Sequence, residues 1–414
     1  MLNRKPELLV PAGSLEVLKT AVRYGADAVY IGGEAYSLRA KAKNFTSEEM
    51  AEGIAYAHEN GVKVYVTANI IAHDSDLEGV REYFSDLAKI KPDAVLIADP
   101  GVFAVEREIC TEIPVHISTQ ANNTNSATFR FWHSLGAERA VCARELTLDE
   151  IAAIREQIPD DMEIECFVHG AMCISYSGRC LLSAYMTGRS ANKGECTHPC
   201  RWKYAVVEEQ RPGEYFPVEE NERGTFIFNS KDLCMIGHIP ELVGAGIGSF
   251  KIEGRMKTAL YVATVARTYR MAIDDYFESP EKYNENLPLY MREIGKCTYR
   301  QFTTGFYFGD PKSEAQIYEN STYVVESRFL GIIEEVTEDG KIRLTQKNKF
   351  CVGDVIEVMK PDGGNIEAAV RAIESTDGIS QESAPHACQV VYVTLDAKGG
   401  EKDYSVGDIL RADA

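Results

Sequence analysis

The chain has 414 residues and a formal net charge of −19 at pH 7, from 44 Lys and Arg against 63 Asp and Glu. No run of 18 apolar residues occurs, so the sequence predicts no membrane-spanning helix. Proteins that hold nucleic acid by bulk electrostatics are normally basic, so any contact with nucleic acid has to come from a local basic patch. The N-terminus lacks an apolar leader, which predicts a cytoplasmic protein.

Short apolar strands alternate with amphipathic helices over the first two thirds of the chain. We expect strands at residues 7–10, 28–31, 62–66, 94–97, 115–117, 139–141, 164–168, 226–228 and 249–252. We expect helices at residues 14–24, 46–60, 76–89, 102–109, 126–135, 148–157 and 259–276. Such repeats predict an α/β fold with a parallel sheet, and nine candidate strands are close to the eight of a closed, TIM-like (β/α)8 barrel. An open doubly wound sheet is the alternative, although no G-x-G-x-x-G motif follows the first strand.

The composition changes after about residue 325. Short alternating strands are expected at 330–333, 341–344, 355–358 and 390–393, and the tripeptide Val-Gly-Asp occurs at both 352–354 and 406–408. This pattern predicts a small C-terminal antiparallel β-barrel at 326–414. We therefore divide the chain into a TIM-like barrel at 1–280 with an insertion at about 170–225, a bridge rich in aromatic residues and glycine at 281–325, and the C-terminal barrel.

Polar side chains follow the expected strands of the first domain, and barrel enzymes place their active sites where the strands end. The expected acid–base groups are His169, Glu145, Lys251 and Glu253. The expected substrate-binding groups are Asn69, Gln120, Arg144, Arg179, Lys231 and Arg255. Arginine forms paired hydrogen bonds with a carboxylate and lysine supplies a point charge, so the set predicts a small carboxylate ligand. Helix caps, ion pairs and, for His169, a buried structural histidine are the alternative roles.

Five of the eleven cysteines fall between residues 173 and 234, in the spacing Cys173-x6-Cys180-x15-Cys196-x3-Cys200-x33-Cys234. Disulfides are disfavoured, because nothing exports the chain and a protein of this length builds a core without them. Thiolates suit zinc and iron–sulfur clusters alike, but the paired C-x2-C knuckles of structural zinc are absent from the sequence. Single cysteines spread over loops favour a 4Fe-4S cluster.

The stretch ECFVHGAMCISYSGRCLLS at 165–183 closely resembles the defining pattern of the U32 peptidase (collagenase-like protease) family. The stretches at 7–14, 27–32, 229–233 and 251–255, and the C-terminal barrel, are also similar to that family, so the resemblance covers nearly the whole chain. The segment 193–202 is most similar to the branch of the family that modifies tRNA. This resemblance implies formation of 5-hydroxyuridine at the wobble position of tRNA, with a 4Fe-4S cluster and prephenate as co-substrate.

The resemblance also implies roles for individual residues. It places the cluster on Cys173, Cys180, Cys196 and Cys234, with Cys200 as the alternative fourth ligand. From the residue types alone, we expect the basic residues around these cysteines to tune the cluster or contact tRNA phosphates, with solvated loop charges as the alternative. We expect two aromatic residues to stack on bases, with packing in the core as the alternative. These basic and aromatic residues are Arg179, Arg189, Lys193, Arg201, Trp202 and Tyr204. The bridge and the C-terminal barrel would dock the anticodon arm.

Two other functions stay open at this point. Proteolysis is one, although the chain has neither the H-E-x-x-H motif of zinc peptidases nor a G-x-S-x-G elbow. Its remaining form is a cysteine peptidase with Cys173 activated by His169. The other is a non-catalytic scaffold that carries a cluster and delivers tRNA to a partner protein. The oligomeric state, including a homo-oligomer, is also open.

Overall fold

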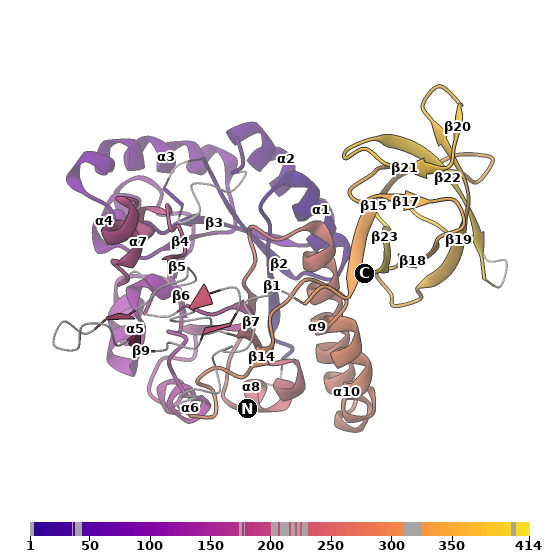
Figure 1. Ribbon diagram of the computed structural model, residues 1–414. Helices are drawn as coiled ribbons and strands as arrows, with labels where there is room; N and C mark the ends of the chain where they lie inside the picture. The colour runs from indigo at the N-terminus through magenta and orange to yellow at the C-terminus, as the bar shows by residue number, and fades with distance from the viewer. Residues whose placement is uncertain are drawn as a thin grey trace.

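The computed structural model describes residues 4–34, 36–37, 44–173, 176–177, 179–199, 206–207, 215–216, 220–221, 224–225, 231–309, 324–398 and 403–414. Two barrels lie side by side, with a pair of long helices between them (Figure 1). Within the described residues, no helix has the length and apolar character needed to cross a membrane.

The larger body is a closed barrel of eight parallel strands. The strand β13 pairs in parallel with both β1 and β7, which closes the sheet. The barrel strands are β1 (Glu7–Pro11), β2 (Ala28–Gly32), β3 (Lys63–Ala68), β4 (Ala94–Ile97), β5 (Val115–Ile117), β6 (Ala137–Val141), β7 (Glu163–Ala171) and β13 (Ser249–Ile252). The TIM-like prediction is confirmed, and the open sheet is wrong because the first and last strands meet.

The helices around the barrel begin where the sequence supplies a side-chain cap. Thr46 and Thr147 each accept a hydrogen bond from the backbone N–H three residues on, and the carboxylate of the Glu at that position accepts one from the backbone N–H of the cap. Ser14, Asp99, Asn125 and Thr258 cap α1, α4, α5 and α9. The helices are α1 (Leu15–Arg23), α2 (Ser47–Glu59), α3 (Leu77–Ile90), α4 (Pro100–Ile109), α5 (Ser126–Ser134), α6 (Leu148–Arg155), α8 (Ile239–Gly244) and α9 (Ala259–Glu278), with 3-10 turns η1 (Asp74–Asp76), η2 (Thr119–Ala121) and η5 (Ile236–His238).

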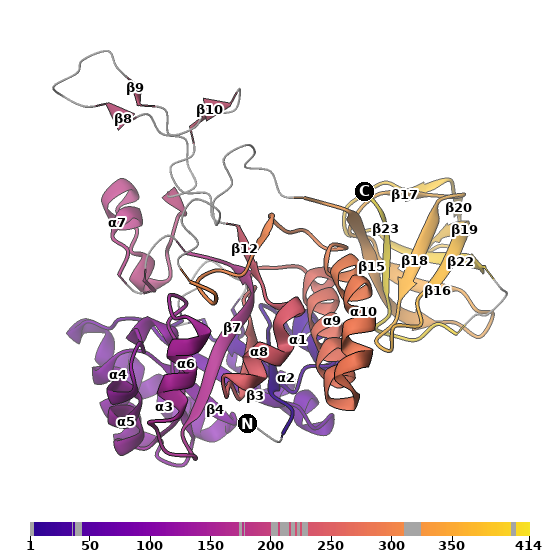
Figure 2. The same cartoon turned by 90° about the horizontal axis from the view of Figure 1, so that it is seen from below.

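A long insertion separates β7 from α8. It carries α7 (Leu182–Thr187), η3 (Ala191–Lys193) and the short strands β8 (Val206–Val207), β9 (Tyr215–Phe216), β10 (Glu220–Asn221) and β11 (Gly224–Thr225). The chain returns in β12 (Asp232–Cys234), which pairs antiparallel with the end of β7 and in parallel with β14 (Phe302–Thr303). Figure 2 shows α7 on the side of the barrel opposite the N-terminus. The strand expected at 226–228 lies outside the described residues.

The C-terminal domain is a closed antiparallel barrel of six strands, as expected. They are β15 (Ser327–Val336), β16 (Ile342–Thr345), β18 (Val355–Met359), β19 (Ile366–Ser375), β22 (Val390–Ala397) and β23 (Ile409–Asp413). The barrel closes where β18 pairs with β19. The domain also contains three two-residue strands, β17 (Phe350–Cys351), β20 (Ser380–Gln381) and β21 (Ser383–Ala384). The sequence did not lead us to expect β19.

The segment 281–325, expected as a bridge, begins as a helix, α10 (Pro280–Ile294), that packs along α9 (Figure 1). At the domain interface, Arg267 of α9 and Arg411 of β23 both bind the carboxylate of Glu293, at 2.6 Å and 2.9 Å. The hydroxyl of Tyr24 donates to the carbonyl of Met359 at 2.7 Å. Buried, paired contacts of this kind fix the C-terminal barrel against the outer helices of the TIM-like barrel.

The interior of the larger barrel holds charged side chains on four of its strands. Arg139 on β6 pairs with Glu7 at 2.5 Å, with Glu163 at 2.6 Å and with Glu165 at 3.1 Å. On the other side of Glu165, the ammonium of Lys251 lies 2.6 Å away, and the side chains of Glu165 and Lys251 are almost completely buried. Each buried carboxylate has a cationic partner. This pairing offsets much of the free energy that is lost when the charges are removed from water.

The buried carboxyl of Glu7 makes the fold's stability depend on pH. Burial of Glu7 disfavours the ionised form and by itself would raise the pKa. The charge of Arg139 and hydrogen bonds from Arg139, Tyr65 and Ser249 favour the ionised form more strongly, so the pKa is lowered below the usual 4.5. Ionised Glu7 therefore stabilises the fold above pH 4.5, and this contribution is lost as the pH falls through the lowered pKa. We expect Glu7→Gln to reduce the free energy of unfolding at pH 7 by about 2 kcal/mol.

Urea unfolding from pH 7 down to pH 3 measures this effect, and the difference between wild type and Glu7→Gln should shrink below about pH 4.5. The matched control is Glu52→Gln, which breaks an exposed ion pair with Lys19 and should cost less than about 1 kcal/mol. A difference that did not change with pH would contradict the assigned role of Glu7.

Candidate functional site

A pocket lies where the parallel strands of the larger barrel end, with the cysteine-bearing insertion on its other side. Its cavity volume is about 190 Å³. The barrel contributes residues from the ends of β2 to β7 and β13, and the insertion contributes residues between 172 and 199. The position agrees with the usual place of active sites in barrels of this kind.

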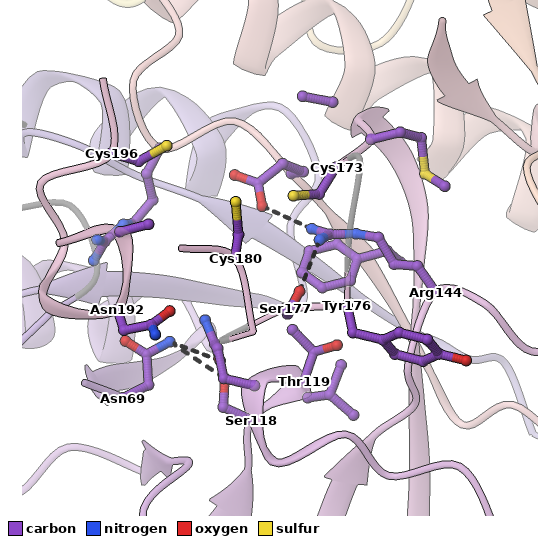
Figure 3. Close-up of a pocket in the computed structure, with 18 of the residues that line it drawn as sticks. Asn69, Ser118, Thr119, Arg144, Cys173, Tyr176, Ser177, Cys180, Asn192 and Cys196 are labelled. Carbon is purple, nitrogen blue, oxygen red and sulfur yellow. Dashed lines mark hydrogen bonds and ion pairs between the residues drawn. The ribbon is translucent and has the colours of Figure 1, made fainter. Parts of the chain in front are cut away.

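Three cationic side chains line one part of the pocket. Arg144 pairs with Glu253 at 3.1 Å, donates to the hydroxyl of Ser177 at 3.3 Å and stacks on the ring of Phe167, with 3.9 Å from its guanidinium carbon to the ring centroid (Figure 3). Lys251 rises from the buried charge network, and burial lowers its pKa below the usual value. Arg255 donates to the hydroxyl of Thr67 at 2.9 Å. This part of the pocket is suited to a small carboxylate.

Amide and hydroxyl groups line another part. The amide nitrogen of Asn69 donates to the hydroxyl of Ser118 at 3.2 Å and to the side-chain oxygen of Gln120 at 3.4 Å. Asn192 reaches the same place from the insertion, and its carbonyl accepts a backbone hydrogen bond from Ile71 at 3.3 Å (Figure 3). Neutral hydrogen-bond donors and acceptors from both the barrel and the insertion thus meet in this part of the pocket. Such groups can bind the polar edge of a heterocyclic ring.

Two glycines let the loop at residues 253–255 approach the strand ends closely. A side chain at Gly13 would put its first carbon 2.0 Å from the carbonyl oxygen of Arg255. At Gly170 the same atom would lie 2.5 Å from the carbonyl oxygen of Glu253, and the backbone there has φ of +107°. Both glycines belong to the stretches that carry the family resemblance, and the contact explains why those positions need glycine.

The thiols of Cys173, Cys180 and Cys196 all line the pocket, and Figure 3 shows their sulfur atoms turned toward the same space. Three thiols on one wall fit the donor set of an iron–sulfur cluster, which is held by thiolates. As placed, no three His, Cys, Asp or Glu side chains in the described part of the chain are grouped closely enough to hold a metal ion. A cluster would therefore require the three cysteine loops to draw together.

The fourth ligand stays a prediction. Cys234 lies on β12, buried, with its backbone opposite His169 and its thiol against the hydroxyl of Tyr269. It is not part of the pocket wall, and burial raises the pKa of its thiol to about 11. Cys200 lies outside the described residues.

The pocket unites six of the ten other predicted site residues and leaves four outside its wall. Lining it are Asn69, Gln120, Arg144, Lys251, Glu253 and Arg255. Outside it are His169, Glu145, Lys231 and Arg179. His169 is buried among Tyr261, Tyr269 and Phe302, and burial lowers its pKa to about 4, which makes it a neutral core residue at pH 7. Burial raises the pKa of Glu145, and Arg179 is exposed.

Several pocket residues were not expected from the sequence. Among them are Tyr30, Thr67, Ser118, Phe167, Tyr176 and Asn192. Ser118 and Thr67 stand at strand ends, so the strand-end rule could have found them. Phe167 and Tyr30 lie within apolar strands and carry no signal of their own. Trp202, Tyr204 and Arg201, expected near the cysteines, lie outside the described residues.

The matches to known families cover both barrels. Residues 13–317 match peptidase family U32, and residues 326–411 match the peptidase family U32 C-terminal domain. The chain belongs to peptidase family U32. The suspected resemblance is thereby confirmed over nearly the whole length.

Relatives within this family carry different names. The chain is 40% identical over 399 residues to "tRNA hydroxylation protein P1" of Bacillus subtilis, covering 96% of this chain and 94% of that protein. It is 33% identical over 380 residues to "23S rRNA 5-hydroxycytidine C2501 synthase" of Escherichia coli, covering 91% of this chain and 52% of that protein. It is also 33% identical over 389 residues to "Collagenase" of Porphyromonas gingivalis, covering 89% of both proteins.

The different exposure of the cysteines predicts their order of reaction. In metal-free protein we expect iodoacetamide to modify Cys173 and Cys388 first, because among the described cysteines these two are exposed. Cys166 should react only after unfolding, because burial raises the pKa of its thiol. Peptide mass spectrometry after short labelling measures all three sites, with urea-unfolded protein as the control in which all cysteines react. Rapid labelling of Cys166 in folded protein would contradict the structure.

Proposed function

We propose that this protein is a cytoplasmic tRNA-modifying enzyme that hydroxylates the wobble uridine to 5-hydroxyuridine. A 4Fe-4S cluster and prephenate, a small dicarboxylate, are its proposed cofactor and co-substrate. Two relatives at full or near-full coverage of this chain are named for RNA hydroxylation, one of them on a pyrimidine base of rRNA, which supports this class of reaction.

The observation that carries the proposal is the shared lining of one pocket. Cys173, Cys180 and Cys196 line it together with Arg144 and Lys251. A peptidase has no use for three thiols beside one another, whereas a cluster needs them. The cationic groups beside them suit a dicarboxylate, and the amide groups opposite suit a base. The thiols, cations and amides of this one cavity support a cluster, a small acid and a base as its proposed occupants.

The three pocket cysteines, with Cys200 or Cys234 as the fourth, would hold the cluster. When bound, an iron–sulfur cluster supplies electron-transfer chemistry with a potential set by its surroundings. The chain's own residues do the rest. Arg144 and Arg255 bind and orient the carboxylates, and Asn69 and Gln120 offer hydrogen bonds to the edge of the base. Insertion residues between 172 and 199 form the side of the cavity opposite the strand ends.

Proteolysis is the weaker candidate. A cysteine peptidase requires a histidine within hydrogen-bonding reach of its nucleophile. Cys173 lies on the pocket wall, but His169 lies outside that wall, packed against Tyr269, with its Nδ1 3.5 Å from the tyrosine hydroxyl. The geometry therefore gives Cys173 no support as a nucleophile activated by His169.

The first test combines metal and nucleoside analysis. Wild type purified without oxygen should contain about four irons and four sulfides, and Cys173→Ala should lose the cluster's broad visible absorption. In a bacterial strain lacking its own hydroxylated wobble uridine, wild type should restore 5-hydroxyuridine in digested tRNA and Cys173→Ala should not. Liquid chromatography with mass spectrometry measures the nucleoside.

The control is Cys110→Ala, which removes a buried thiol far from the pocket wall and should leave both readouts intact. One zinc and no sulfide would contradict the proposed cofactor. A protein that carries a full cluster and binds tRNA but leaves uridine unmodified would indicate the non-catalytic scaffold instead.

The second test addresses the dicarboxylate. We expect Arg144→Gln to weaken prephenate binding by roughly 10- to 100-fold, the range of one lost charged hydrogen-bond contact. Glu253→Gln should strengthen binding, because it removes the carboxylate that competes with the ligand for Arg144. Titration calorimetry with the cluster-loaded protein measures both affinities.

Arg130→Gln is the matched control, since Arg130 is exposed on α5 and its loss should not change prephenate affinity. Equal affinities for wild type and Arg144→Gln would rule out the proposed carboxylate site, while leaving hydroxylation itself to the nucleoside analysis.

A further inference from the structure

The insertion above the pocket exposes an unusual concentration of large apolar side chains. Tyr185 is 86% exposed, Leu181 70%, Tyr176 46% and Met186 40%. The described residues contain fifteen exposed large hydrophobic side chains, and these four fall within eleven consecutive positions. Single exposed apolar residues are normal on protein surfaces, but a contiguous group marks a place of interaction.

One face of α7 packs against the rest of the insertion, and the opposite face is exposed to solvent. The hydroxyl of Ser183, which is completely buried, accepts a hydrogen bond from the backbone of Thr197 at 3.1 Å, and the hydroxyls of Thr187 and Thr197 lie 3.2 Å apart. The helix ends at Gly188, whose φ of +69° turns the chain back. Tyr185 therefore stands on a short, anchored helix and faces solvent.

The charge around this face is opposite to that of the whole protein. Residues 179–199, which carry this face, contain three Lys and Arg and one Glu, whereas the chain as a whole has 44 basic and 63 acidic residues. Arg179 and Arg189, on either side of α7, are both exposed. A cationic segment on an acidic protein is complementary to a polyanion and marks where a polyanion would approach.

The exposed face is next to the pocket. Tyr176, half exposed, lines the cavity, and so does Leu182 at the start of α7. In Figure 2, α7 stands beyond the strand ends on the open side of the barrel. A polymer bound on α7 would thus have one of its units within reach of the cavity.

We propose that Tyr185, with Leu181 and Tyr176, forms a stacking platform for unpaired RNA nucleotides beside the one that enters the pocket. The proposal rests on the proposed function and names the surface that the RNA substrate uses. Unpaired loop bases present flat faces that stack on exposed aromatic rings without regard to sequence, while arginines bind the flanking phosphates. Double-stranded RNA hides those faces, so the platform selects a loop.

The test is fluorescence anisotropy with a labelled, unmodified anticodon stem-loop RNA and the full-length protein, purified without oxygen. Tyr185→Ala should weaken binding at least fivefold, which corresponds to about 1 kcal/mol, the lower end for one base stacked on an aromatic ring. Tyr185→Phe keeps the ring and should bind as wild type does. Arg189→Gln should weaken binding and flatten its dependence on salt.

Phe131→Ala is the matched control, because Phe131 is 54% exposed on α5, away from the pocket wall. A blunt RNA duplex without a loop should bind weakly and equally to wild type and Tyr185→Ala. Circular dichroism verifies that each variant is folded.

The outcomes separate the two proposals. If wild type does not bind the stem-loop, the proposed function fails, and the platform fails with it. If wild type binds and Tyr185→Ala binds equally well, only the platform is overturned. The platform is also overturned if Phe131→Ala weakens binding as much as Tyr185→Ala does. A third outcome is that Tyr185→Ala changes self-association in sedimentation and leaves the RNA affinity unchanged. The exposed face of α7 would then be a contact between two copies of the protein.

Discussion

The ion pairs inside the larger barrel are the constraint on which the site depends. Arg139 stands among three carboxylates, and Lys251 completes the set on the far side of Glu165. Glu163 has a further partner in Arg4, so three cations face three carboxylates. Replacing buried ion pairs by apolar residues of the same volume is often neutral or stabilising, so stability alone does not explain these charges. They hold the ammonium of Lys251 at the floor of the pocket, where an isolated lysine would be costly to bury.

The placement of the cysteines follows from the shape of β7. This strand has nine residues, and its end pairs with β12 in the opposite direction, beyond the point where the other barrel strands stop. The chain that leaves it at Met172 therefore begins above the barrel, and the chain that returns at Asp232 is fixed beside it. Between these two points, insertion residues from Met172 to Pro199 line the cavity. The thiols of the insertion and the strand-end cations then face one cavity, so a ligand of either group changes the environment of the other.

The sequence predicted the barrel well because its signals are local. Apolar strands, capped helices and polar strand ends recur at regular intervals, and they were sufficient to find Asn69, Gln120, Arg144 and Lys251 in the pocket. The strand β19 escaped notice because Ile366–Ser375 contains three alanines and alternates weakly. The helix α10 was not expected because its aromatic residues were assigned to the bridge between the two domains. His169 follows a strand as an active-site residue would, but the direction of its side chain depends on β12, which is distant in sequence.

For the proposed RNA substrate, the acidity of the protein leaves the insertion as the surface that can attract it. With a net charge of −19, the body of the protein repels a polyanion at distances up to the Debye length, about 8–10 Å in ordinary buffer. Attraction has to act at contact, from a few arginines and from base stacking, which does not depend on charge. An RNA loop is then held only where both are available. On the described surface these two features coincide at α7, beside the pocket that contains the three cysteines. Repulsion from the rest of the surface thus contributes to selectivity, because it disfavours every other way of docking the same RNA.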